Sequence, residues 1–61
     1  MQDRRPVRQR LTAHYTSEEI AVWMHRAHPQ LGDQSPRHLI HQGRAEEVHR
    51  VIDRLDDGAY I

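Results

Sequence analysis

The chain has 61 residues and a mass of 7.3 kDa, which limits it to a single domain. A chain this short buries only about 60% of its unfolded surface, so its hydrophobic core is marginal. Nine arginines balance nine acidic residues at pH 7, which argues against a strongly basic nucleic-acid binder. The lack of cysteine excludes a disulfide-stapled secreted protein and a Cys-based zinc finger.

The sequence also contains no apolar run of about 18 residues and no signal peptide, so we expect a cytoplasmic protein without membrane contact. About 60 residues seldom enclose a ligand-sized pocket. We therefore expect a binding module rather than an enzyme, with no catalytic residue, cofactor or metal site.

The N-terminal residues are rich in arginine and poor in apolar side chains. Residues 1–15 carry too little apolar surface to offset the entropy of ordering them, which predicts a flexible Arg-rich arm. In an alternative interpretation the arm grips the phosphates of a nucleic acid. Its candidate contacts are Arg4, Arg5, Arg8 and Arg10.

Three helices are predicted after the arm. Thr16 and Glu19 form a capping box, which predicts a helix over 17–27 that ends at His28-Pro29. Residues 28–35 follow as a loop, in which Leu31 is expected to fill the core. Ser35-Pro36 then begins a short helix over 36–41, with Gly43 just past its end. Apolar spacing predicts the last helix over 45–57, and Gly58 ends it.

These elements predict an all-α fold, a small bundle of about three short helices over residues 16–61. A core this thin usually gains stability from a partner, so we expect a protein partner or a homodimer. The large apolar residues available for the core are Ile20, Val22, Trp23, Met24, Leu31, Leu39, Ile40, Val48, Val51, Ile52, Leu55, Tyr60 and Ile61.

Several polar or aromatic residues allow both a structural and a functional interpretation. Trp23 is expected in the core, with an interface anchor as the alternative. Six histidines are expected at the surface or at helix ends, His28 and His41 among them, because a zinc site without cysteine needs ligands from separate elements. The acidic residues of 46–57 are interpreted as a solvated face or as a surface for a basic partner.

The ordered set of motifs resembles the toxin-binding domain of the Xre/MbcA/ParS antitoxins. The resemblance covers about residues 17–61, where the order and spacing of the motifs agree from the tryptophan to the terminal aromatic. The residues that carry it are Trp23-Met24, His28-Pro29-Gln30-Leu31-Gly32, Ser35-Pro36, Leu39-Ile40, Gly43-Arg44, Val48, Ile52, Leu55 and Gly58-Ala59-Tyr60.

The resemblance implies a small helical domain that binds a RES-type toxin, an enzyme of bacteria that degrades NAD or uses it for ADP-ribosylation. The antitoxin's C-terminal end would cover the toxin's active site, which by position assigns toxin binding to Gly58, Ala59, Tyr60 and Ile61. Many family members also carry a helix-turn-helix domain, for which residues 1–15 offer no room. An orphan or phage-encoded antitoxin is therefore possible, and a nucleic-acid-binding module or a structural oligomerisation module are the alternatives.

Overall fold

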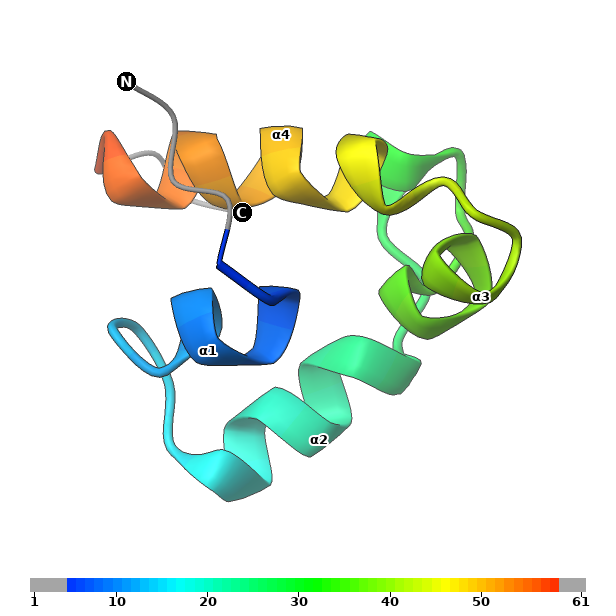
Figure 1. Ribbon diagram of the computed structural model, residues 1–61. Coiled ribbons are helices and arrows are strands. Elements are labelled where there is room, and N and C mark those ends of the chain that lie inside the picture. Colours follow the sequence, from blue (N-terminus) through cyan, green and yellow to red (C-terminus); the bar gives the residue numbers. More distant parts are fainter. Residues whose placement is uncertain (1–4, 59–61) are drawn as a thin grey trace.

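The computed structural model describes residues 5–58, and within this range the chain forms four α-helices and one 3-10 turn (Figure 1). In chain order these are α1 (Val7–Leu11), α2 (Ser17–His25), the 3-10 turn η1 (Pro29–Leu31), α3 (Pro36–His41) and α4 (Ala45–Asp56). The all-α prediction is confirmed. The described residues contain no strand, only an isolated bridge between His28 and Gln34.

The two predicted start signals have the geometry that the sequence indicates. The Thr16 hydroxyl accepts a hydrogen bond from the Glu19 N–H, and the Glu19 carboxylate accepts one from the Thr16 N–H. The Ser35 hydroxyl likewise accepts from the His38 N–H at the start of α3. These bonds satisfy amide groups that have no partner within the helix.

The helix ends agree with the predictions to within two residues. α2 ends at His25, whereas the sequence predicts an end at residue 27, because Arg26 already has an extended backbone. The last helix ends at Asp56. Gly43 adopts a φ of +77° in the turn between α3 and α4, a left-handed conformation that glycine adopts without strain.

The N-terminal segment differs from the predicted flexible arm. Residues 7–11 form α1, with Pro6 just before its first residue, and the Val7 and Leu11 side chains are buried in the core. The spacing of these two residues places them on one face of the helix, and Leu11 is fully buried. Residues 1–4 lie outside the described residues.

The core lies where α1 meets α4 and where α3 packs against both α2 and α4. Leu31 of η1 is buried in it, as predicted. Val22 is a correction: its side chain is 58% exposed, because it lies on the face of α2 away from the core. Tyr60 and Ile61 lie outside the described residues. The buried apolar residues are Val7, Leu11, Ile20, Trp23, Met24, Leu31, Leu39, Val48, Val51 and Ile52.

Candidate functional site

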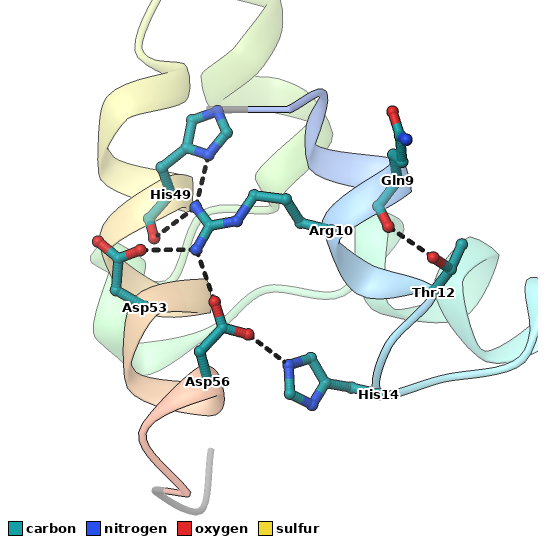
Figure 2. Close-up of polar contacts among 7 residues, drawn as sticks. All are labelled: Gln9, Arg10, Thr12, His14, His49, Asp53 and Asp56. Atoms are coloured by element: carbon teal, nitrogen blue, oxygen red, sulfur yellow. Dashed lines mark hydrogen bonds and ion pairs between the residues drawn. The ribbon is translucent and has the colours of Figure 1, made fainter. Parts of the chain in front are cut away.

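One face of α4 carries three polar residues in helical register. His49, Asp53 and Asp56 follow one another at spacings of four and three residues, so they share a stripe along the helix. This stripe lies beside the apolar stripe that faces the core. α1 packs against α4, which brings Arg10 onto the polar stripe (Figure 2).

The Arg10 guanidinium binds all three residues. Its Nη2 atom lies 2.6 Å from Asp53 Oδ1 and 2.9 Å from Asp56 Oδ2, and its Nη1 atom lies 2.8 Å from His49 Nδ1 and 3.4 Å from the His49 carbonyl oxygen. Because a guanidinium only donates hydrogen bonds, His49 Nδ1 must accept here.

The ion pairs of Arg10 are partly buried. The Arg10 side chain is only 1% exposed, whereas those of Asp53 and Asp56 are 32% and 41% exposed. Burial opposes the charge of Arg10, but hydrogen bonds and charge attraction from the two carboxylates outweigh it, so the pKa of Arg10 is raised. Two half-exposed carboxylates thus hold one buried cation in place.

Asp56 connects this network to a second histidine. His14, in the turn after α1, donates from Nε2 to Asp56 Oδ1 over 2.7 Å (Figure 2). The hydrogen bond from His14, followed by that from Arg10, lowers the pKa of Asp56 below its ordinary value. We call Arg10, His14, His49, Asp53 and Asp56 the Arg10 network. It fastens the last two turns of α4 to the N-terminal segment.

The predicted toxin-binding residues begin immediately after this network. Gly58 lies two residues beyond Asp56, has a φ of +86°, and donates its N–H to the Leu55 carbonyl oxygen over 3.0 Å. It closes α4 as predicted. Ala59, Tyr60 and Ile61 lie outside the described residues.

Three of the predicted phosphate-binding arginines, Arg5, Arg8 and Arg10, are among the described residues, and they do not share one exposed surface. Arg4 lies outside the described residues, while Arg5 and Arg8 are exposed. Arg10 is a correction, because its guanidinium is buried against α4 and cannot reach a phosphate. Two of the acidic residues of α4, Asp53 and Asp56, bind Arg10 within the chain.

Trp23 lies in the core, where its side chain packs against the imidazole of His28 with ring centroids 4.7 Å apart. His28 lies just beyond the end of α2, near the helix end at which it was expected. It is buried, and its Nε2 lies 3.0 Å from the Trp23 carbonyl oxygen. The contacts between these two residues hold the end of α2 against the loop that follows it.

Sequence reasoning missed the Arg10 network, although two of its signals are in the sequence. One is the polar stripe His49-Asp53-Asp56, and the other is the Val7–Leu11 spacing, which places Arg10 on a helix beside buried side chains. Neither signal shows by itself which helices pack together. Within residues 5–58, no group of three or more histidine, cysteine, aspartate or glutamate side chains is placed so that it could hold a metal ion. No helix in this range has the length and apolar character needed to cross a membrane.

Comparison with protein families gives a match to the antitoxin Xre/MbcA/ParS C-terminal toxin-binding domain over residues 10–58. The match includes Arg10, His14 and all of α2 to α4, and it ends at Gly58. Comparisons with curated proteins and with solved structures found no significant match. Because the family match covers more than half of the sequence, the chain belongs to the family of Xre/MbcA/ParS antitoxin toxin-binding domains.

Proposed function

We propose that this protein is an antitoxin that binds a RES-type NAD-consuming toxin and covers its active site with the C-terminal end. The residues proposed to enter the active site are Gly58, Ala59, Tyr60 and Ile61. The observation that carries the proposal is the match to a toxin-binding domain over residues 10–58. The protein would act in the cytoplasm by binding alone, without a cofactor.

The anchoring of α4 supports a role for this end of the molecule. Asp53 and Asp56 hold the last two turns of the helix against Arg10, and His14 adds a second contact to Asp56. Gly58 therefore directly follows a helix end that is held in place. A helix end that is already ordered loses less entropy on binding, which favours tight binding.

The apolar character of the last two residues supports the same role. Tyr60 and Ile61 offer an aromatic and an aliphatic side chain directly after the end of a helix. Aromatic residues are frequent among those that dominate binding free energy at protein interfaces. Occlusion of an NAD site needs such a group and a stable scaffold, and it needs no catalytic side chain in the antitoxin.

The test uses the full chain with an N-terminal tag as bait in a lysate of the source organism, and mass spectrometry to identify what it captures. We expect one NAD-consuming enzyme, whose NAD turnover the purified chain inhibits. A chain lacking Tyr60 and Ile61 should keep its helical circular dichroism and lose roughly 30-fold in inhibition, equivalent to about 2 kcal/mol.

A matched control is Arg8→Ala, which alters an exposed residue of α1 away from the Arg10 contacts and should inhibit like the natural chain. Equal inhibition by the truncated chain would show that another surface blocks the toxin. Capture of nucleic acid alone, with affinity that falls steeply with salt, would replace the proposal with the arginine-arm interpretation.

A further inference from the structure

The outer face of α2 carries a short stripe that lies outside the residues proposed to enter the toxin's active site, Gly58 to Ile61. Glu18, Val22 and Arg26 follow one another at intervals of four residues, so they lie one turn apart along the helix and its C-terminal cap. Val22 is 58% exposed, and among the described residues it is the one large apolar side chain that is exposed. We call these three residues the α2 stripe.

The two charges of the α2 stripe are exposed and uncompensated within the described chain. Neither the Glu18 carboxylate nor the Arg26 guanidinium forms an ion pair with any residue of 5–58, unlike Arg10 and Arg44, which bind carboxylates. All three stripe residues line one open hollow of about 700 Å³. Trp23 lines the same hollow, and its buried indole N–H has no hydrogen-bond acceptor within the described residues.

Along α2 the stripe consists of an acidic, an apolar and a basic residue, in that order. A second copy that runs in the opposite direction therefore offers a basic residue opposite the acidic one. If two copies of α2 lie antiparallel about a two-fold axis near Val22, each Val22 meets the other. Each Glu18 then faces Arg26 of the partner subunit, and the pairing occurs twice. A two-fold interface requires this property, because each patch must complement its own copy.

We propose that the α2 stripe is a homodimer interface, in which a second copy of the chain docks antiparallel across Val22. Charge complementarity favours a second copy of this chain over an unrelated protein, because the chain itself carries both the acidic and the basic residue of each ion pair. The contact area of one short helix face is small, so the dimer is weak and forms at high protein concentration. Dimerisation also stabilises the thin core by mass action.

The position of the stripe keeps the dimer compatible with toxin binding. α2 and α4 lie on opposite sides of the molecule, with α1 between them in the view of Figure 1. A second copy on α2 therefore leaves the end of α4 uncovered. The dimer presents two C-terminal ends at once, and the proposal does not depend on the identity of the toxin.

The experiment is sedimentation velocity of the purified full chain over a concentration series up to about 1 mM, the range in which weak complexes dissociate. We expect a monomer–dimer equilibrium. Glu18→Arg and Arg26→Glu should each weaken it by about tenfold or more, because each change places like charges opposite one another twice. Val22→Asp should weaken it as well.

Charge reversal makes the test specific for the proposed geometry. An equimolar mixture of the Glu18→Arg and Arg26→Glu chains should dimerise again, since both facing pairs in the mixed dimer are opposite in charge. The double variant E18R/R26E should also dimerise. Arg37→Glu makes the same charge change on an exposed residue of α3 and should leave the equilibrium unchanged.

Circular dichroism on each variant separates loss of association from loss of folding, and all changes are at exposed positions. A chain that remains monomeric throughout the series would overturn the proposal. So would a dimer that tolerates the single charge reversals, or a mixture that fails to restore association. Because no toxin is present, these outcomes are independent of the neutralisation test.

Discussion

Arg10 shows how one residue can change role between sequence and structure. Its position among four arginines suggests a solvated charge, yet its side chain is 1% exposed and bonded to three residues of α4. Removing a buried charge partner generally destabilises a protein by more than the pair contributes, because the remaining groups lose their compensation. The half-exposed carboxylates of Asp53 and Asp56 can still reach water, which limits that effect here.

We therefore expect Arg10→Met to lower the free energy of unfolding by about 2 kcal/mol, measured by urea denaturation. Arg10→Lys should recover only part of this loss, because an ammonium group cannot reproduce the fork that binds Asp53, Asp56 and His49. Arg8→Met on the exposed face of the same helix serves as the control and should change stability by less than about 0.5 kcal/mol. Equal effects of the two methionine variants would contradict the structural role of Arg10.

The contacts of Asp56 predict that the stability of the folded chain depends on pH. Hydrogen bonds from His14 and Arg10 lower the pKa of Asp56 in the folded state, so the unfolded state takes up its proton at a higher pH. The stabilisation is complete above the ordinary aspartate pKa of about 3.9 and is lost as the pH falls through the lowered value. Urea midpoints measured between about pH 2 and 6 should decrease with acidification, and Asp56→Asn should flatten that decrease. An unchanged slope in Asp56→Asn would assign the acid sensitivity to other carboxylates.

At the scale of elements, the helices with complete signals could be predicted and α1 could not. The caps at Thr16 and Ser35 fix the starts of α2 and α3 by local hydrogen bonds, which the sequence reveals directly. α1 has five residues and no side-chain cap, and a helix this short is unstable alone. Its stability comes from tertiary contact with α4, which no local pattern records.

The contribution of α1 to the core predicts that Leu11→Ala is strongly destabilising. Leu11 is fully buried, so its truncation leaves a cavity and should lower the free energy of unfolding by about 3 kcal/mol in urea denaturation. Leu11→Met nearly conserves the volume and should lower it by less than about 1.5 kcal/mol. A flexible arm would tolerate both changes equally, so a neutral Leu11→Ala would restore the arm interpretation for residues 7–11.

At the scale of the molecule, the fold class and the family follow from the sequence, whereas the pairing of distant residues does not. Apolar periodicity and turn residues determine which segments are helices, and their order identifies the toxin-binding domain. The Arg10 contacts to Asp53 and Asp56 span 43 and 46 positions. Such contacts depend on how helices pack, and the position of Arg10 in a charged segment conceals them.

These long-range contacts predict that the bundle unfolds as one unit. Trp23 is the single tryptophan and lies on α2, away from the Arg10 network that joins α1 to α4. Because one core includes residues of every α-helix, the urea transition followed by Trp23 fluorescence should coincide with that followed by far-UV circular dichroism. Arg10→Met should move both midpoints down together, although Arg10 lies in a different part of the bundle. If the circular dichroism midpoint falls while that of fluorescence stays, α1 and α4 unfold separately, and the end of α4 has its own local stability.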